Sequence, residues 1–250
     1  MNIYGLIGYP LSHSFSPEYF ANKFRKEKIA DSEYKLFPLE DISQLPILLE
    51  TYTEIRGLNV TIPYKEKVMA FMDSMDDVVR KVGAMNTIKI SRTGGKIRLS
   101  GHNSDVYGFY HSLLPLLEPS HKKALILGTG GASKAVSFVL DSLGIRYRFV
   151  SRSPKSSSDL SYVQLERQLI EEYTLIINST PVGMFPHFNE CPAIPYQWIG
   201  PNHLLYDLIY NPDETLFLQH GKERGAIVKN GLEMLHLQAE RSWEIWNRKE

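Results

Sequence analysis

A lysine at position 65 follows a short apolar segment and a proline turn, in the stretch that runs from residue 59 to residue 65. The apolar pattern predicts a strand over residues 57–62, in which Asn59 and Thr61 point to the same face because they are two residues apart. An amide and a hydroxyl beside an ammonium group could receive a polyhydroxylated anion. The alternative is a buried strand followed by a solvated lysine, since most lysines are exposed.

Two serines and an aspartate supply further polar groups near the ends of predicted elements. Ser14 and Ser16 follow the first predicted strand, where open α/β sheets bind ligands, so they could hold a carboxylate. Ser16 could instead serve only as a helix cap. Asp105 begins a predicted helix and could face Lys65 across a cleft, with a capping carboxylate again as the alternative. His13 has no second potential ligand at a recognisable spacing, and we expect no metal site.

A glycine-rich turn at residues 128–133 follows a compact apolar strand pattern at 124–127 and precedes a predicted helix. Gly128 and Gly130 would let the backbone turn sharply and approach a pyrophosphate, which the amides at the start of the helix would receive. Ser133 stands where the usual fingerprint has a third glycine. The segment predicts a dinucleotide site, and a purely structural glycine turn is the alternative.

The next predicted strand ends in a basic, hydroxyl-rich turn, Ser151-Arg152-Ser153-Pro154-Lys155. An enzyme that prefers NAD usually has an acidic residue here, which binds the ribose hydroxyls. Arg152 offers a planar donor fork, Ser151 and Ser153 flank it, and Lys155 adds charge; together these groups suit a 2′-phosphate. We therefore predict NADP(H) in preference to NAD, with a solvated basic turn as the alternative.

The composition is that of an ordinary globular chain of 250 residues, 43% of them hydrophobic and 22% charged. Lysine plus arginine and aspartate plus glutamate each count 28, so no overall field attracts nucleic acid or an anionic membrane. Cys191 is the single cysteine, which excludes an internal disulfide and fits a reducing compartment. The N-terminus does not resemble a signal peptide, and no segment approaches the roughly 20 apolar residues that span a bilayer. We expect a soluble, cytoplasmic protein with a small-molecule partner.

Strand-like and helix-like patterns alternate from the N-terminus, which predicts an α/β fold with parallel strands. In the first part of the chain we expect strands at 2–8, 33–37, 57–62, 85–90 and 96–99, with a hairpin between the last two. In the second part, which has a Rossmann-type pattern, we expect strands at 124–127, 146–150, 174–177, 204–209 and 226–228.

The last predicted helix, residues 232–247, has an apolar stripe at helical spacing that includes two tryptophans. It follows the nucleotide-domain strands directly and needs another surface on which to bury this stripe. We therefore expect it to return to the first domain. The predicted organisation is a discontinuous substrate domain of residues 1–103 and 232–250, with a Rossmann-type dinucleotide-binding domain of residues 104–231 between its parts.

These segments together resemble the shikimate dehydrogenase family, from residue 4 to about residue 246. The resemblance rests on motifs in order along the chain: Gly8-Tyr9-Pro10, His13 to Pro17, Asn59 to Lys65, Gly83 to Thr87, Asn103 to Asp105, Gly128 to Ser133, Asn178 to Met184, Asp207 to Pro212, and Gly231 to Leu235 with Gln238. The chain departs from the family at Ser104, where threonine is common, and at the serines that flank Arg152, where asparagine and threonine are common. Both departures keep a short polar group.

The resemblance implies the reversible, NADP-dependent reduction of 3-dehydroshikimate to shikimate in aromatic amino-acid biosynthesis. It implies that Lys65 and Asp105 are the catalytic pair and that Ser14 and Ser16 bind the substrate carboxylate. The implied ligands of the ring hydroxyls are Thr61, Asn86, Asp105 and Gln238, with Asn59 and Tyr210 near the same pocket. The implied cofactor residues are Gly128, Thr129, Gly130, Gly131, Ala132, Ser133, Ser151, Arg152, Ser153, Lys155, Thr180, Leu208, Gly231 and Met234.

Two alternative functions stay open at this point. A quinate or dual shikimate/quinate dehydrogenase would tend to use NAD and would accept an additional hydroxyl on the carbon that bears the carboxylate; Arg152 argues against it. A nucleotide-binding regulatory protein that kept the fold and lost catalysis would not need both Lys65 and Asp105. The sequence does not distinguish a monomer from a homodimer.

Overall fold

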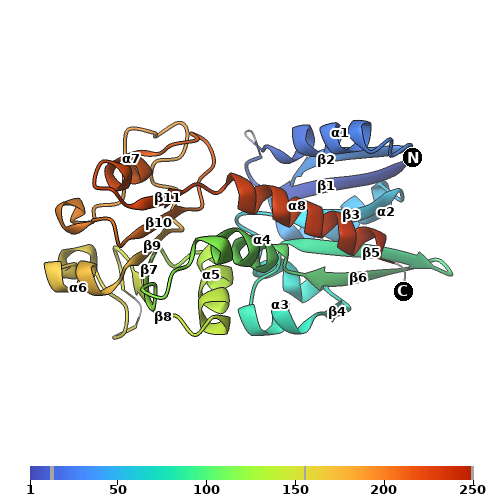
Figure 1. The fold of residues 1–250 in the computed structure, drawn as a ribbon. Helices are drawn as coiled ribbons and strands as arrows, with labels where there is room; N and C mark the ends of the chain where they lie inside the picture. The colour runs from blue at the N-terminus through green and yellow to red at the C-terminus, as the bar shows by residue number, and fades with distance from the viewer. Residues whose placement is uncertain (12–13, 155, 249–250) are drawn as a thin grey trace. The chain divides into compact units, whose positions relative to one another are not determined.

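The structure is a computed structural model that describes residues 1–11, 14–154 and 156–248. The chain forms two compact units, Met1–Ser104 with Ala239–Glu250, and Asp105–Gln238 (Figure 1). The boundary between the units falls inside two helices, α4 (Ser104–Leu113) and α8 (Leu232–Asn247). Each unit contains a β-sheet covered by helices, and the predicted α/β fold class is confirmed.

The first unit is built on a six-stranded sheet in the order β2-β1-β3-β5-β6-β4. Its strands are β1 (Asn2–Gly8), β2 (Ser32–Pro38), β3 (Ile55–Val60), β4 (Ser74–Met75), β5 (Thr87–Thr93) and β6 (Lys96–His102). β1 runs parallel to β2 and β3, whereas β5 is antiparallel to β3 and β6, so the sheet is mixed. The expected hairpin joins β5 to β6, and Gly94 and Gly95 at its turn both have positive φ, which glycine adopts without strain.

Side chains of β1 alternate between two hydrophobic layers, as those of a central strand do. Ile3 and Ile7 belong to one buried cluster, and Tyr4 and Leu6 belong to another. The first layer contains α2 (Leu45–Thr51), α3 (Asp77–Val82) and the 3-10 turns Ile42–Gln44 and Lys67–Phe71; the second contains α1 (Ser16–Lys26) and the end of α8. Both faces of the sheet are therefore covered.

The second unit contains a five-stranded parallel sheet in the order β11-β10-β9-β7-β8. Its strands are β7 (Lys123–Leu127), β8 (Arg146–Val150), β9 (Leu175–Asn178), β10 (Leu204–Asp207) and β11 (Ile227–Lys229). One face is covered by α4, α5 (Gly131–Ser142) and the start of α8, and the other by α6 (Arg167–Glu172) and α7 (Leu216–Lys222). Short 3-10 turns lie at Leu114–Leu116, Tyr162–Gln164 and Tyr196–Trp198. The arrangement is the predicted Rossmann-like one.

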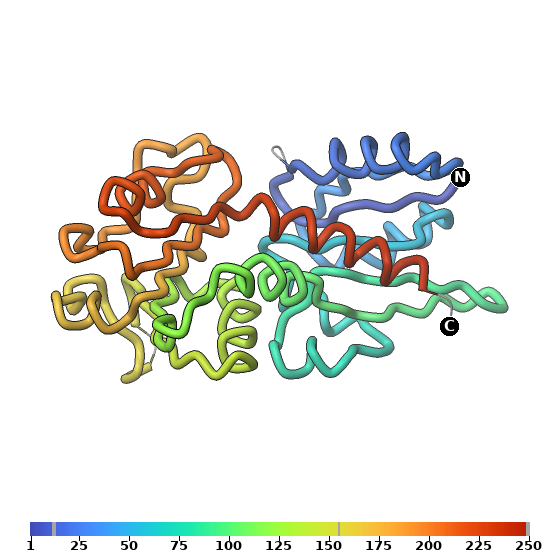
Figure 2. The backbone as a smooth tube through the Cα atoms, in the orientation of Figure 1, coloured from blue at the N-terminus to red at the C-terminus, as the bar shows by residue number. Residues whose placement is uncertain are grey.

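The C-terminal half of α8 packs on the sheet of the first unit, as its apolar stripe predicts (Figures 1 and 2). Trp246 is 6% exposed, and its ring N–H donates to the carbonyl oxygen of Ile88 at 3.0 Å. A Cβ added to Gly57 of β3 would lie 2.3 Å from the indole ring of Trp246. The close approach of helix and sheet therefore requires glycine at position 57.

A buried lysine that pairs with two exposed glutamates connects α1 to α8. The ammonium group of Lys23 donates to Glu27 at 2.7 Å and to Glu240 at 2.6 Å, and its side chain is only 5% exposed. The hydroxyl of Tyr19 also donates to Glu240. Burial disfavours the charged lysine, but the two glutamates outweigh burial and hold the pKa of Lys23 above its usual value. The contact between the helices thus includes a fully partnered charge.

The third strand begins and ends two residues earlier than the sequence predicts. β3 ends at Val60, and the next residues form a turn in which the Tyr64 amide donates to the carbonyl oxygen of Thr61 at 2.9 Å. Pro63, inside this turn, has no N–H with which to continue a strand ladder. Only Asn59 of the pair lies within β3, although the Thr61 amide still donates to the carbonyl oxygen of Ile7 at 2.9 Å, so the shared face of Asn59 and Thr61 stays a prediction.

Replacement of Gly57 by alanine is expected to destabilise the first unit. The added methyl group would overlap the ring of Trp246, and overpacking of this kind costs about 1–3 kcal/mol. Chemical unfolding followed by tryptophan fluorescence measures the effect. The matched control is Gly200→Ala, because a Cβ at that position meets nothing within 4 Å. Equal stability of the two variants would contradict the assigned contact.

Candidate functional site

Segments that contain the predicted substrate residues leave the first sheet at one edge. Ile7 of β1 pairs with Val60 of β3, Asn59 pairs with Thr87 at the start of β5, and Thr87 pairs with His102 at the end of β6. The turns that follow β1, β3 and β6 and the turn that precedes β5 therefore lie side by side. They contain Ser14, Thr61, Lys65, Asn86 and Asn103, and the helices that follow two of them begin at Ser16 and Ser104.

Main-chain hydrogen bonds hold the turn of Lys65 beside the turn of Asn86. The carbonyl oxygen of Lys65 accepts from the Met85 amide at 2.8 Å, and that of Asn86 accepts from the Val60 amide at 2.8 Å. The side chains of Lys65 and Thr61 are both half-buried. The position of the lysine is thus set by backbone bonds between the two turns.

A network of buried hydroxyl groups lies beneath these turns. The hydroxyl oxygens of Thr87, Ser104 and Ser242 lie 2.9–3.1 Å from one another, and all three residues are 0% exposed. Asn59 donates its Nδ2 to the Ser242 hydroxyl at 2.8 Å and accepts from the Tyr34 hydroxyl at 2.8 Å through Oδ1. Asn59, expected near the substrate pocket, therefore supports the network from below.

The same network sets the orientation of the Asn86 amide. Its Oδ1 accepts from the Ser104 amide at 2.7 Å, from the Ser104 hydroxyl at 3.1 Å and from the Thr87 hydroxyl at 3.2 Å. Because these donors fix the oxygen, the amino group of Asn86 occupies the other branch of the amide, where it is a donor. Asp105, which is 4% exposed, follows Ser104 directly, so one contact fixes both Asn86 and the start of α4.

The two serines after β1 are joined to the same region through Tyr34. α1 begins at Ser16 with Phe15 as its N-cap residue, so the alternative in which Ser16 caps the helix is wrong. The Ser14 hydroxyl accepts from the Ser16 amide at 3.3 Å. Burial raises the pKa of Tyr34, and a hydrogen bond with the Ser16 side chain opposes this rise. Tyr34 thus lies between Ser16 and Asn59.

Asp105 and Gln238 lie on two helix segments that pack closely within the second unit. Gly108 is on the same face of α4 as Asp105, because it lies one turn further along the helix. A Cβ added to Gly108 would lie 2.6 Å from the carbonyl oxygen of Met234 and 3.2 Å from Cβ of Gln238. The face of α4 that includes Asp105 is therefore the face that meets α8.

The predicted cofactor residues follow the carboxyl ends of adjacent parallel strands. Leu127, the last residue of β7, pairs with Val150 of β8 and Asn178 of β9, and Asn178 pairs with Asp207 of β10. Each of these residues ends its strand, so the turns begin at the same level. The strand order reverses direction between β7 and β9, and open α/β sheets bind ligands at such a point.

The glycine turn fits a dinucleotide. Gly128 has φ of +99°, and a Cβ there would lie 2.8 Å from Cγ2 of Thr180, so glycine is required. Gly130 has an ordinary φ of −83°, and a Cβ there would meet nothing within 4 Å. Neither strain nor packing explains this second glycine, but the space beside its backbone suits the close approach of a phosphate group. Ser133, in place of the third glycine, donates to the carbonyl oxygen of Gly130 at 2.7 Å.

Arg152 is exposed in the turn that follows β8. The Ser151 hydroxyl accepts from the Ser153 amide at 3.2 Å and shapes this turn. Burial raises the pKa of Tyr162, and the positive charge of Arg152 opposes the rise, so the guanidinium lies within electrostatic reach of that ring. Lys155, predicted for the same site, lies outside the described residues.

The remaining predicted residues differ in their surroundings. Thr180 donates its hydroxyl to Oδ1 of Asn178 at 2.6 Å. Gly231 lies against Leu208, because a Cβ there would be 2.1 Å from the carbonyl oxygen of Leu208. Met234 is 7% exposed and belongs to the hydrophobic cluster between α4, α5 and the sheet. Tyr210 is half-buried in the turn after β10.

Asp207 is a buried carboxyl group to which the sequence assigned no role. It ends β10 and is 0% exposed. Burial raises its pKa to about 7, although hydrogen bonds from Thr215, Ile209 and Asn178 lower it. The feature of the sequence that could have indicated a role for Asp207 was its place at the start of the motif 207–212.

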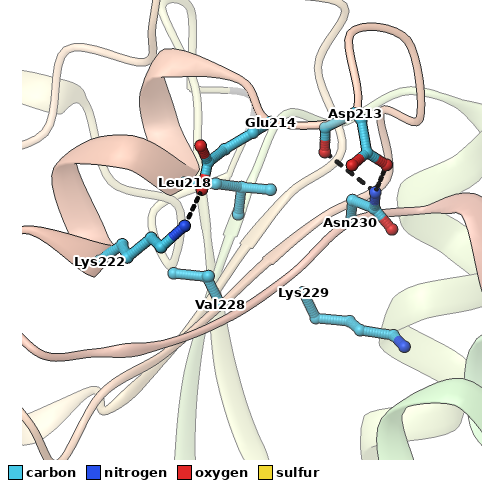
Figure 3. A pocket seen from close by; sticks show the side chains of 7 residues that line it. All are labelled: Asp213, Glu214, Leu218, Lys222, Val228, Lys229 and Asn230. Carbon is cyan, nitrogen blue, oxygen red and sulfur yellow. Dashed lines mark hydrogen bonds and ion pairs between the residues drawn. The ribbon is translucent and has the colours of Figure 1, made fainter.

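A pocket of about 340 Å³ lies between α7 and the end of β11 (Figure 3). Its lining residues are Asp213, Glu214, Leu218, Lys222, Val228, Lys229 and Asn230. Lys222 pairs with Glu214 at 2.8 Å, and Asn230 donates to Asp213 at 2.6 Å. Four of the lining polar residues thus pair with one another, Lys229 pairs with Glu233 outside the lining, and none of the predicted site residues lines this pocket.

Within residues 1–11, 14–154 and 156–248, no three or more His, Cys, Asp or Glu side chains are grouped so that they could hold a metal ion. His13 lies outside these ranges. Across the same part of the chain, no helix combines the length and apolar character that a membrane crossing requires.

Comparison with known proteins connects this geometry to a family. Residues 6–88 match the family model described as the shikimate dehydrogenase substrate binding domain. The chain is 40% identical to the NADP(+) shikimate dehydrogenase of Clostridium beijerinckii, over 98% of this chain and 92% of that protein. The crystal structure of shikimate dehydrogenase 1 from Peptoclostridium difficile is 37% identical, with a TM-score of 0.85 over 98% of this chain and 92% of that one. Shikimate 5-dehydrogenase from Thermus thermophilus, solved with NADP(H) and shikimate, is 29% identical, with a TM-score of 0.81 over 99% and 94%.

Removal of the Ser242 hydroxyl is expected to weaken the folded state. In Ser242→Ala, Asn59, Thr87 and Ser104 each lose one of their buried partners and keep another, and the loss of a hydrogen bond costs about 0.5–1.5 kcal/mol. The free energy of unfolding, measured with urea, should fall by that amount. Ser142→Ala is the control, because the Ser142 hydroxyl is exposed and bonds only to Val139 of its own helix. If the two variants were equally stable, the network would contribute nothing.

Proposed function

Because the chain belongs to the shikimate dehydrogenase family, we propose that it catalyses the reversible, NADP-dependent reduction of 3-dehydroshikimate to shikimate. The observation that carries this proposal is the strand register of the first sheet, which brings the turns of Ser16, Lys65 and Asn86 to one edge. Hydroxyl, ammonium and amide groups at one edge suit a small acid with several ring hydroxyls.

We assign the two units to the two ligands. We propose residues 1–103 and 232–250 as the substrate domain and residues 104–231 as the NADP-binding domain; the compact units themselves divide after Ser104 and after Gln238. The parallel sheet with its glycine turn supports the second assignment, and the polar edge of the mixed sheet supports the first. The single cysteine suits a reducing cytoplasm, and the balanced charge gives no reason to expect nucleic acid or membrane partners. A monomer or homodimer fits the assignment.

The cofactor residues divide by the part of NADP(H) that they suit. The amides of Thr129 to Ser133, at the start of α5, face the pyrophosphate, since a helix N-terminus favours an anion. The guanidinium of Arg152, with Ser151 and Ser153 beside it, binds the 2′-phosphate. Thr180, Leu208, Gly231 and Met234 follow neighbouring strands and shape the nicotinamide end. NADPH supplies the hydride that reduces the ketone.

The substrate residues divide in the same way. Ser14 and Ser16 donate hydroxyl hydrogen bonds to the carboxylate. Thr61, Asn86 and Gln238 bind ring hydroxyls, and Asn86 does so as a donor because its oxygen is held by Ser104. Asn59 contributes through the hydroxyl network beneath Asn86, and Tyr210 borders the pocket from the turn after β10.

Reduction of the ketone to a hydroxyl group requires one proton in addition to the hydride. When the ketone carbon receives the hydride, its oxygen becomes an alkoxide, and the ammonium group of Lys65 donates the proton that converts it to the hydroxyl. Asp105, as a carboxylate, accepts a hydrogen bond from that hydroxyl and fixes its direction. In shikimate oxidation both transfers are reversed: the hydride goes to NADP, and the proton returns to Lys65.

The lysine and serine variants should show opposite kinetic patterns. Lys65→Ala removes the proton donor and should lower kcat by about 10²–10⁴-fold, with KM for shikimate changed by no more than about threefold. Ser14→Ala should raise this KM by about tenfold and leave kcat nearly intact. Initial rates of NADP reduction measure both constants.

The control for the lysine variant is Lys67→Ala, an exposed lysine two residues further on that should leave both constants unchanged. The role assigned to Lys65 is wrong if Lys65→Ala retains turnover close to that of Lys67→Ala.

The choice of cofactor and acid is tested in one assay matrix. Shikimate and quinate are each oxidised with NADP and with NAD, and the pair shikimate and NADP should give the highest kcat/KM. Arg152→Ala should lower kcat/KM for NADP by about 10–100-fold, the value of a lost bond to a charged group, and barely change that for NAD.

Equal use of NAD and NADP by the unmodified protein would favour the quinate alternative. Stabilisation of the protein by NADPH without any turnover of either acid would favour the regulatory alternative.

A further inference from the structure

Asp207 joins several cofactor-binding turns of the second unit. It is the last residue of β10 and pairs directly with Asn178, the last residue of β9. Its side chain is 0% exposed, so the carboxyl group has lost all contact with water and depends on the protein for its partners. The family resemblance includes Asp207 in a motif but implies no function for it.

Three donors from three different segments converge on this carboxyl group. Oδ1 accepts from Nδ2 of Asn178 at 3.0 Å and from the amide of Ile209 at 3.0 Å. Oδ2 accepts from the hydroxyl of Thr215, the N-cap residue of α7, at 2.6 Å. Asp207 therefore links the turn after β9, its own turn after β10 and the start of α7.

The link through Asn178 leads to the glycine turn. Because Nδ2 of Asn178 is directed to Asp207, its Oδ1 is left to accept from the amide of Thr180 at 3.1 Å and from its hydroxyl at 2.6 Å. Thr180 in turn lies against Gly128, where an added Cβ would be 2.8 Å from its Cγ2. The orientation of the Asn178 side-chain amide thus couples the position of Thr180 to that of Asp207.

The link through Ile209 leads to Leu208 and Gly231. The bond from the Ile209 amide to Asp207 closes a tight turn around Leu208. The carbonyl oxygen of Ile209 accepts from the Gly231 amide at 2.9 Å, and Gly231 approaches Leu208 so closely that only glycine fits. Two more of the assigned cofactor residues are therefore held by the turn that Asp207 closes.

We propose that Asp207 is a positioning residue for NADP(H): its buried carboxyl group sets the geometry of the turns that contain Thr180, Leu208 and Gly231 without touching the cofactor. The proposal rests on the proposed function for the identity of the cofactor. It concerns hydrogen-bond geometry and not charge.

The partners of Asp207 are compatible with either protonation state. The ionised form accepts three hydrogen bonds. In the neutral form, a proton on Oδ2 is donated to the Thr215 hydroxyl, which has a second lone pair for the Leu218 amide at 3.5 Å, while Oδ1 keeps its two donors. Asparagine at position 207 reproduces this neutral pattern, with its amino group directed to Thr215. Alanine reproduces neither pattern.

The decisive comparison is between Asp207→Ala and Asp207→Asn. Asp207→Ala should raise the KM for NADP and the dissociation constant for NADP by about tenfold or more, with the KM for shikimate changed by less than about twofold. Asp207→Asn should restore both NADP constants to within about threefold of the unmodified protein. Initial-rate kinetics and calorimetric titration with NADP measure these constants.

Ser112→Ala is the control for general destabilisation of the same sheet. The Ser112 hydroxyl is buried and bonds to the hydroxyl of Tyr206 at 2.6 Å; Tyr206 is next to Asp207 in sequence, but this bond lies away from the cofactor turns. We expect this variant to lose thermal stability and keep both NADP constants. If it weakened NADP binding as much as Asp207→Ala did, or if Asp207→Asn were as impaired as Asp207→Ala, the positioning role would be overturned.

A second variant covers the case in which Asp207→Ala does not fold. Asn178→Ala cuts the link from Asp207 to Thr180 and leaves the bonds from Ile209 and Thr215 in place, so it should raise the NADP constants severalfold; unchanged constants would overturn the proposal. Titration with NADP does not depend on turnover. If the unmodified protein bound NADP but oxidised no shikimate, the proposed function would fail, while the Asp207 comparison would still be decided.

Discussion

The pairing of strands in register is the interaction on which the rest of this structure depends. Buried backbone groups must find hydrogen-bond partners, and in both units they find them in strands that end at matching levels. In the first sheet the register brings Val60 and Thr87 to one edge, and in the second it aligns Leu127, Asn178 and Asp207. A slip of one residue would turn each functional side chain to the opposite face. The chemistry of the protein is therefore set by register before any side chain acts.

Both edges also contain polar groups without access to water, and the two units satisfy them differently. In the first unit, neutral hydroxyl and amide groups around Ser242 exchange hydrogen bonds, so that donors and acceptors can rotate to suit one another. In the second unit, a single carboxyl group at Asp207 collects three donors. The first arrangement orients Asn86, and the second orients Asn178. In each case the orientation of an asparagine amide couples a buried group to residues of a proposed ligand site.

The elements with strong local signals could be predicted from the sequence, and long-range partners could not. The last helix, residues 232–247, has the predicted bounds, because its apolar stripe is regular, and the glycine turn follows its strand as expected. The end of β3 was misjudged because an apolar residue before Pro63 reads as strand although it lies in a turn. Ser242 gave no signal in the sequence, and the signal for Asp207 was limited to its place at the start of the motif 207–212. Their importance comes from residues far apart in sequence, such as Asn59 and Thr87 for Ser242, and only tertiary structure brings these together.

The place of α8 has a consequence for the order in which the protein is made. Its tryptophans are translated after both sheets, yet Trp246 fills a cluster that contains Tyr4 and Phe20, more than 200 residues earlier in the sequence. At a synthesis rate of about 5–20 residues per second, α8 is synthesised on the order of tens of seconds after these aromatic side chains. The first unit is thus completed only after the second unit has been synthesised. Until then, the aromatic cluster on its sheet lacks the residues that α8 contributes.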